Sequence, residues 1–154
     1  MRQDGRVLIG LLITTCLFRV SQAQNSSNAT AKHVEIAPVP ARQEDVSTLD
    51  GIIKASYETG SGPAGQPRQW ARDRTLYVSD VRFTIFMNGN GKSVALQFTY
   101  QEFADMANPI MVHNGYYEHE IHRVTYRYGD WAHIISTSEE RRTPTGPVTR
   151  ALDR

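Results

Sequence analysis

Alternating apolar and polar residues between Gly115 and Glu140 form the clearest pattern in this chain, and they flank the pair Gly129-Asp130. Alternation with a period of two is typical of strands. Glycine at the first position of a two-residue turn allows the positive φ that hairpin turns of the primed types require. The pattern therefore predicts two long strands joined by this turn. The predicted facing pairs are Tyr128 with Trp131, Tyr126 with His133, Val124 with Ile135, His122 with Thr137, and Glu120 with Glu139.

Apolar residues at helical spacing predict two helices near the start of the domain. Asp45 is expected to cap the first helix, whose apolar positions lie within residues 46–57. The glycine-rich stretch 60–65 ends this helix. Pro67 suits the first turn of a second, short helix that carries Trp70.

A strand pair and a third helix complete the region before the hairpin. The predicted strands are residues 81–87 and 93–100, joined by a turn at Asn88-Gly89-Asn90-Gly91. Thr99 and Glu102 have the spacing of a capping box, which predicts a helix that Pro109 limits. Helices mixed with antiparallel strands in this order predict an α+β fold.

The first part of the chain reads as an export signal followed by a linker. Residues 7–18 form an apolar run after the basic residues Arg2 and Arg6, which predicts a cleaved signal peptide. We therefore expect a secreted or periplasmic protein without membrane contact after cleavage. Polar residues interrupted by Pro38 and Pro40 predict a disordered leader. The predicted division is a signal peptide over 1–23, a disordered leader over 24–42 and one domain over 43–154.

Composition favours a soluble globular domain, with 40% hydrophobic and 21% charged residues. The formal net charge of +1 becomes −1 once residues 1–23 are removed, and no basic patch dominates the rest. Nucleic acid is therefore not an expected partner. Cys16 is the only cysteine and lies inside the predicted signal peptide, so neither a disulfide nor a thiol nucleophile is expected after cleavage. No motif calls for a cofactor.

Three segments between Glu44 and Arg141 together resemble a known family by their order. They are DVSTLDGIIKASYE, WARDRTLYVSDVRF and GYYEHEIHRVTYRYGDWAHIISTSEER. Their order resembles that of the nuclear transport factor 2-like superfamily, most closely its SnoaL-like branch, which includes the polyketide cyclases. The resemblance implies a cone-shaped, curved antiparallel sheet wrapped around helices, a cystatin-like α+β barrel with a pocket between sheet and helices. It also implies a homodimer formed through the outer face of the sheet.

Domains of this kind continue with a further strand or hairpin after the loop that residues 141–147 would form. The resemblance therefore leaves two alternatives: either the sequence is a fragment, or the domain lacks its C-terminal strand or strands. Members of this superfamily are enzymes, small-ligand binders or association modules, so fold alone leaves all three functions open.

His122 and His133 are candidates for acid–base chemistry, because the predicted hairpin places them on one face with Tyr126 between them. The same register places Glu120 and Glu139 nearby on that face. A histidine beside a carboxylate can transfer protons near neutral pH. The alternative is that these side chains are exposed to solvent or lie at a dimer interface.

Asp80 is a third candidate base, since it precedes a predicted strand and lies near Tyr77 in the sequence. The resemblance implies an isomerase-type mechanism, which needs a carboxylate base and a donor to an oxyanion. The alternative is that Asp80 is an exposed turn residue. Further ligand-binding candidates are Trp131 on the histidine face and Arg123 on the opposite face. The sequence leaves open which face lines the pocket.

No metal site is expected, because alternation places His119 and His122 on opposite faces of their strand. Three functions stay open. The chain could bind a small hydrophobic or carbonyl-bearing molecule. It could be a cofactor-free isomerase, cyclase or dehydratase that works by proton transfer. It could instead be an association module that uses a face of its sheet.

Overall fold

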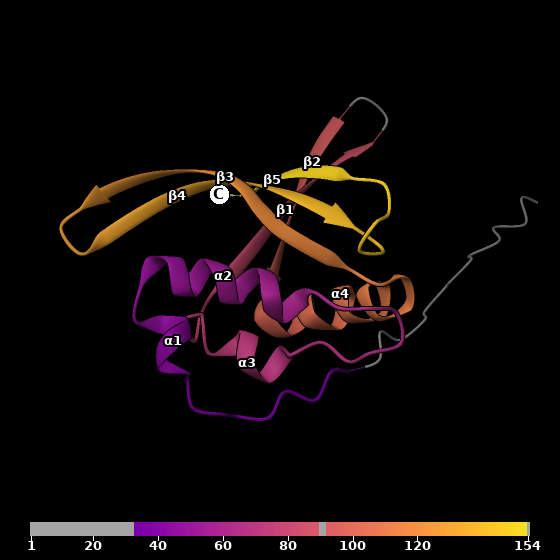
Figure 1. Ribbon diagram of the computed structural model, residues 1–154, viewed down its shortest axis with the longest axis horizontal. Helices are drawn as coiled ribbons and strands as arrows, with labels where there is room; N and C mark the ends of the chain where they lie inside the picture. The colour runs from indigo at the N-terminus through magenta and orange to yellow at the C-terminus, as the bar shows by residue number, and fades with distance from the viewer. Residues whose placement is uncertain (1–32, 90–91, 154) are drawn as a thin grey trace, which may run out of the picture.

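The computed structural model describes residues 33–89 and 92–153, and it combines four helices with two antiparallel sheets in the described part (Figure 1). The coarse α+β prediction is therefore confirmed. The predicted signal peptide, residues 24–32 of the leader and residues 90–91 of the predicted turn lie outside the described residues. The described helices are α1 Gln43–Val46, α2 Leu49–Gly60, α3 Trp70–Arg74 and α4 Tyr100–Asn114.

The first predicted helix is divided in two, so its predicted cap at Asp45 is wrong. Thr48 has an extended backbone between α1 and α2, and its hydroxyl accepts a hydrogen bond from the Gly51 amide at 3.0 Å. Threonine is a preferred N-cap residue because it satisfies a helix-end amide in this way. Asp45 lies inside α1 and is buried.

Helix α4 begins as predicted and ends later than predicted. Thr99 and Glu102 form the reciprocal capping box, whereas Pro109 lies inside the helix. The last turns are held from outside the helix, because Arg68 donates to the Met111 carbonyl at 2.6 Å and the Gly65 amide donates to Val112 at 2.7 Å. These contacts satisfy carbonyl groups near the helix end that have no partner within the helix.

The strands form two separate antiparallel sheets in the described part of the chain. The first pairs β1 Arg82–Gly89 with β2 Lys92–Thr99, and the second has the order β3 Tyr117–Tyr128, β4 Trp131–Arg141 and β5 Thr149–Asp153. The sheets do not close into a barrel within these residues. Strand β5 follows the loop after β4 and pairs with β4, so the expectation that no further strand follows this loop is wrong. Residues 149–153 gave no sign of it, because they have no clear alternation of their own.

The long hairpin has the predicted turn and most of the predicted register. Gly129 has a φ of 55°, which is the conformation that glycine was expected to provide. Four of the five predicted pairs are confirmed, from Tyr128 with Trp131 to His122 with Thr137. The fifth is wrong, since a β-bulge between Glu120 and His122 pairs Glu120 with Ser138. An extra residue in one strand moves every side chain beyond it to the other face.

The core lies where α3, α4 and β1 meet. Trp70, Tyr100, Ala104 and Ala107 form its buried centre. Residues 33–42, assigned by sequence to the disordered leader, run extended past this centre, and Val34 and Ile36 pack against it. The Val34 amide also donates to Asp105 of α4 at 2.7 Å. The sequence did not predict this contact, because a short extended segment has no hydrophobic pattern that identifies the element it packs against.

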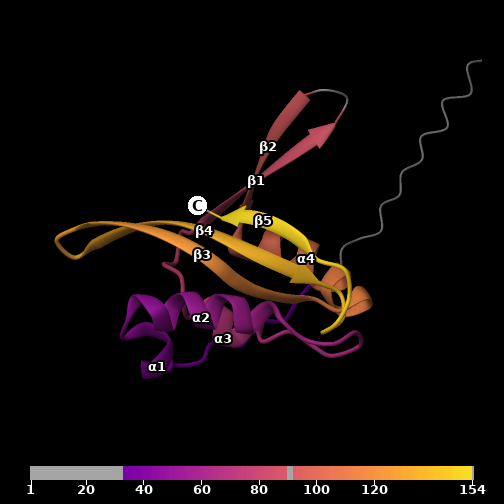
Figure 2. The same cartoon turned by 45° about the horizontal axis from the view of Figure 1, so that its top comes forward.

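The hairpin β3–β4 crosses over α2, and the β1–β2 hairpin points away from the helices (Figures 1 and 2). One face of the β3–β4–β5 sheet is therefore turned toward α2, and we name it the inner face. Its outer face is turned away from the helices. Some candidate residues lie on the inner face and the others lie on the outer face.

Candidate functional site

The β-bulge decides which side chains lie beneath α2. Glu120 pairs with Ser138, and after the bulge Arg123 pairs with Ser136. Residues directly opposite each other in an antiparallel pair share a face. Glu120 and Arg123 therefore lie together on the inner face, and the prediction that Glu120 shares a face with His122 is wrong.

Glu120 joins the sheet to α2 through a continuous polar network. Its Oε1 accepts a hydrogen bond from Ser136 Oγ at 2.6 Å, and that hydroxyl lies 2.9 Å from the Tyr57 hydroxyl of α2. Its Oε2 lies 3.1 Å from an Arg123 guanidinium nitrogen, and Arg123 also contacts Asp50 at 2.8 Å. The carboxylate is thus partnered on both oxygens.

Glu118 forms the next set of hydrogen bonds on the inner face. Ser138 Oγ donates to one of its carboxylate oxygens at 2.6 Å, and the Tyr116 hydroxyl donates to the other at 2.7 Å. Its amide donates to Ser61 Oγ, just beyond α2, at 3.0 Å. Ser138 is fully buried, which makes this polar layer part of the interior. The interface between α2 and the sheet is therefore built from hydroxyls and carboxylates.

A cavity of about 670 Å³ opens at the end of this layer, where α2 ends, β3 begins and the loop after β4 passes. Its lining includes Glu58, Ser61, Glu118, His119, Arg141 and Thr145. The volume is in the range of small-molecule sites, roughly 300–1,000 Å³. Carboxylates, a guanidinium and hydroxyls give such a cavity both donors and acceptors for a polar ligand.

Most residues of this polar layer were not predicted from the sequence. Tyr57, Glu118, Ser136 and Ser138 were not among its candidates. A usable signal was present, because Ser136 and Ser138 are small polar residues at alternate positions of β4. Alternate residues of a strand share a face, so this pair points to a polar contact beneath it.

The outer face carries the two histidine candidates. His122, His133 and Tyr126 are all exposed there, and the rings of Tyr126 and His133 have their centres 6.4 Å apart. Tyr128 and Trp131 at the end of the hairpin are 88% and 82% exposed. The predicted grouping of the two histidines with aromatic side chains is confirmed. These histidines line neither the cavity beside Glu118 nor the one beside Arg74.

Glu139 also lies on the outer face but serves a different cluster. Its carboxylate lies 3.2 Å from Arg141 and 3.2 Å from Arg150 of β5, and 4.0 Å from His119. The bulge separates it from Glu120, so the two carboxylates do not form the facing pair that sequence predicted. Glu139 instead links β3, β4 and β5.

Tyr77 and Asp80 lie in different environments, one in the core and one exposed to solvent. The Tyr77 ring packs in the aromatic core, with its centre 5.3 Å from that of Phe83 and 5.8 Å from that of Tyr100. Asp80 is exposed in the turn before β1. The exposed-turn alternative for Asp80 is the one that agrees with its position.

A buried carboxylate that sequence did not single out joins three helices. Asp73 of α3 accepts hydrogen bonds from the Thr59 hydroxyl at 2.5 Å and from the Tyr100 hydroxyl at 2.7 Å. Burial raises the pKa of Asp73, although both hydroxyl donors act in the opposite direction. Burial and the neighbouring Asp73 raise the pKa of the Tyr100 hydroxyl. This cluster connects α2, α3 and α4.

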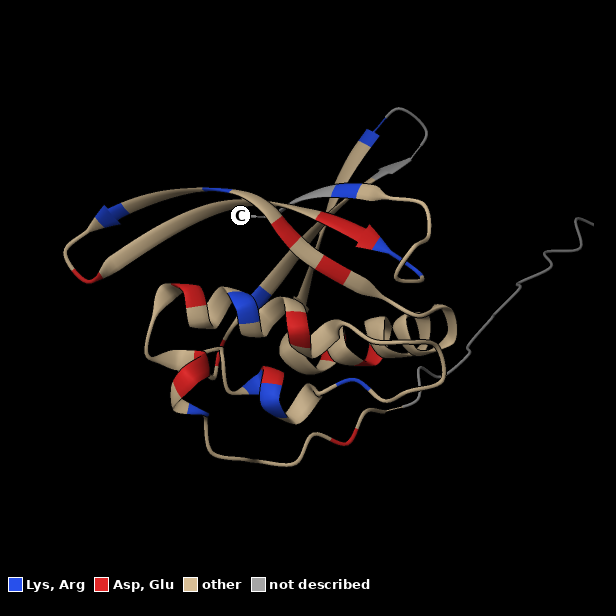
Figure 3. Cartoon of the chain, in the orientation of Figure 1, with Lys and Arg blue, Asp and Glu red and all other residues tan. Residues whose placement is uncertain are grey.

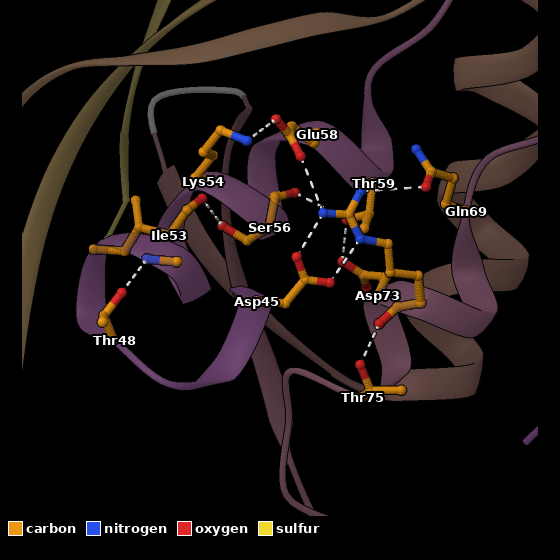
Figure 4. A network of polar contacts seen from close by, with 12 residues as sticks. Asp45, Thr48, Ile53, Lys54, Ser56, Glu58, Thr59, Gln69, Asp73 and Thr75 are labelled. Atoms are coloured by element: carbon orange, nitrogen blue, oxygen red, sulfur yellow. Dashed lines mark hydrogen bonds and ion pairs between the residues drawn. The ribbon is translucent and has the colours of Figure 1, made fainter. Parts of the chain in front are cut away.

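An ion-pair network fastens α1 to α2 and α3, as Figure 4 shows around Asp45 and Glu58. Arg72 donates to both carboxylate oxygens of Asp45 at 2.7 Å and to Glu58 at 3.0 Å. Its hydrogen bond lowers the pKa of Asp45, and hydrogen bonds from Lys54 and Arg72 lower that of Glu58. These groups stabilise the helical layer.

No family model, curated protein or solved structure matches this chain. The described residues contain no cluster of three or more histidine, cysteine, aspartate or glutamate side chains arranged to hold a metal ion. Within the same part of the chain, no helix has the length and apolar character needed to span a membrane. The case for function therefore rests on the surfaces and cavities of the chain itself.

Proposed function

We propose that this chain is an association module that forms a homodimer through the outer face of β3 and β4. The observation that carries the proposal is the exposure of three large aromatic side chains on this face: Tyr126 at 59%, Tyr128 at 88% and Trp131 at 82%. Contiguous exposed apolar surface of this kind marks interaction sites, and tyrosine and tryptophan are the residues enriched at their centres.

The chemistry of this face favours a second copy of the chain as the partner. Its half near the turn is formed by Val124, Tyr126, Tyr128, Trp131, His133 and Ile135. None of these six residues is an aspartate, glutamate, lysine or arginine. A two-fold dimer places a surface against itself, so a neutral face brings no like charges together.

The small core of the described residues supports the same proposal. Its buried hydrophobic residues are Ile53, Ala55, Trp70, Tyr100, Ala104 and Ala107. All of them lie on helices or beside them, and none is on the β3–β4 hairpin. A long hairpin whose apolar side chains are exposed gains stability when another surface covers it.

Sedimentation velocity over a range of protein concentrations tests the dimer. The wild-type chain should sediment as a dimer, and Trp131→Gln and Tyr126→Gln should shift it to monomer at the same concentration. Phe86→Gln is the matched control, because Phe86 is 71% exposed but lies on the β1–β2 hairpin. A monomer at every wild-type concentration, or an equal effect of the control, would contradict the proposal.

Small-ligand binding is the second candidate, and the cavity of about 670 Å³ beside Glu118 favours it. A carbonyl-bearing molecule could accept hydrogen bonds from Arg141 or His119 there. A thermal-shift screen against small carbonyl compounds tests this candidate. A stabilising compound should lose its effect in Arg141→Gln but not in Arg127→Gln, whose site is exposed near the end of β3. The absence of any stabilising compound would count against it.

The proton-transfer candidate has less support. A general base works best beside a substrate held in a site that excludes water, and His122 and His133 are exposed on the outer face. In the association proposal these histidines belong to the dimer surface.

The remaining parts of the proposal come from sequence. A SnoaL-like domain of the nuclear transport factor 2-like superfamily, with its sheet curved into a cone around the helices, agrees with the order of elements along the chain. Export to a secreted or periplasmic location follows from the signal-like residues 1–23. Detection of a mature N-terminus at Gln24 by mass spectrometry of the exported protein would support it, and an intact Met1 form would oppose it.

A further inference from the structure

A second cavity, of about 520 Å³, lies apart from both the outer face and the layer beneath α2. It is bounded by the end of α3, the turn before β1 and the first turn of α4. Arg74, Ser79, Asp80 and Arg82 contribute to its lining, and we name it the Arg74–Arg82 cavity. Figure 3 shows the basic positions of α3 and of the start of β1.

Arg74 is held in place by neutral groups. Its guanidinium donates to the Tyr77 carbonyl at 2.9 Å and to the Ser79 carbonyl at 3.3 Å. Its central carbon lies 5.1 Å from the centre of the Tyr100 ring, in the range of a cation–π contact. These contacts orient the guanidinium without neutralising its charge.

Arg82 is arranged in a similar way. One of its guanidinium nitrogens donates to the carbonyls of Asp80 and Val81 at 3.0 and 2.9 Å. None of the ion pairs formed by the described residues includes Arg74 or Arg82. The cavity thus contains two oriented guanidinium groups that lack a carboxylate partner.

The lining of the cavity holds two guanidinium groups and one carboxylate. Asp80 is the carboxylate in its lining, and it forms none of those ion pairs. Glu102, in the first turn of α4, accepts hydrogen bonds from the Thr99 amide at 2.8 Å and the Thr99 hydroxyl at 2.9 Å. These bonds and the charge of Arg82 lower the pKa of Glu102, but this carboxylate forms no ion pair with either arginine among the described residues. The two arginines thus offer guanidinium N–H groups that no carboxylate of the described residues occupies.

We propose that the Arg74–Arg82 cavity binds a small molecule through an oxyanion, either a carboxylate or a phosphate group. Guanidinium groups form the preferred planar, charge-assisted hydrogen bonds to both. Because backbone carbonyls already orient both arginines, little side-chain freedom is lost when the anion binds. The Ser79 hydroxyl, which makes no hydrogen bond among the described residues, offers a further donor.

An NMR titration of arginine side-chain Nε–H signals tests this proposal. Inorganic phosphate and acetate are added separately to the whole protein, with sodium chloride adjusted to keep the ionic strength constant. Saturable shifts of the Arg74 and Arg82 signals are expected with at least one of the two anions. Saturation with one anion alone identifies the preferred group, and saturation with both identifies a general oxyanion site.

Matched variants separate a binding site from non-specific charge. Arg82→Gln changes an exposed side chain and should weaken the apparent affinity about tenfold, or 1.4 kcal/mol. Arg127→Gln, exposed on β3, should leave it unchanged. Arg74→Gln should abolish saturation, and circular dichroism checks its fold. Shifts that grow linearly without saturation for both anions, or an Arg82→Gln affinity equal to that of the wild type, would overturn the proposal.

Discussion

The Tyr100 hydroxyl offers a sharp test of the buried polar cluster, because Tyr100→Phe removes one oxygen and retains the ring. That oxygen lies 2.7 Å from Asp73 Oδ2 and 3.1 Å from the Trp70 carbonyl. The ring remains available to its aromatic neighbours Tyr77 and Phe83. The change therefore isolates a hydrogen bond to a buried carboxylate from the packing of the ring.

The magnitude follows from the loss of this donor. A hydrogen bond to a charged group contributes about 1.5–3 kcal/mol, so we expect a loss of about 2 kcal/mol in the free energy of unfolding. For a domain of this size that corresponds to a fall in Tm of roughly 8 °C. Thr59→Val should interact with Tyr100→Phe non-additively, because both hydroxyls donate to Asp73.

Urea unfolding followed by tryptophan fluorescence provides the measurement, since Trp70 is 6% exposed in the folded chain and becomes exposed on unfolding. Thr84→Val is the control, because it removes a hydroxyl from an exposed residue of β1 and should change stability by less than about 0.5 kcal/mol. A Tyr100→Phe protein as stable as this control would refute the reasoning.

The same cluster sets a pH dependence. Burial raises the pKa of Asp73 above its ordinary value of 3.8, so the folded chain holds this proton more tightly than the unfolded chain does. The contribution of Asp73 to stability is therefore largest below pH 3.8 and falls as the pH rises through the folded-state pKa. Tyr100→Phe removes a donor that favours the charged form, so its cost should shrink in acid. A cost that grows as the pH falls would contradict this sign.

The remaining predictions concern the backbone and the helical layer. Gly115→Ala should destabilise the fold by more than about 2 kcal/mol, because Gly115 has a φ of 74° and a Cβ there would collide with the Arg142 carbonyl. Gly65 has a φ of 80° but open space around it, so Gly65→Ala should lower the free energy of unfolding by less in the same urea assay. Equal losses for the two variants would refute the role of the Arg142 carbonyl. Arg72→Gln should cost about 3 kcal/mol, since it leaves the buried Asp45 carboxylate without its ion-pair partner. The hydrogen bond from Arg72 lowers the pKa of Asp45. This stabilisation is therefore present above the ordinary value of 3.8 and is lost as the pH falls through the folded-state pKa. A stability difference between wild type and Arg72→Gln that persists in strong acid would contradict this prediction.

Local patterns predicted the parts of this fold whose cause is local. The turn at Gly129 and the capping box at Thr99 each depend on a few neighbouring residues, and each is present. The short helix that carries Trp70 is present too, but it begins at Trp70, so Pro67 lies before it and not in its first turn. The late end of α4 beyond Pro109 was not predictable in this way. It depends on Arg68, whose side chain reaches the helix from a distant loop.

The candidate site was predicted only in part, because some of its contacts are local and others join distant elements. Alternation correctly placed His122 and His133 on one face, because the pattern is uninterrupted between them and the turn. Asp73 gave no signal, since a charged residue in a short amphipathic segment ordinarily faces solvent. It became an interior group only when α2 and α4 brought Thr59 and Tyr100 to its two oxygens.

Local residues specify the long hairpin around Gly129-Asp130, since turn chemistry and strand alternation act over a few residues. Which side chains each face of that hairpin presents depends on contacts between distant elements. The bulge after Glu120 adds one residue to β3, and this single addition turns Glu118 and Glu120 toward the hydroxyls beneath α2. These side chains bind Ser136 and Ser138 of β4, and Ser136 binds Tyr57 of α2, which are long-range contacts that the alternation of β3 alone does not show.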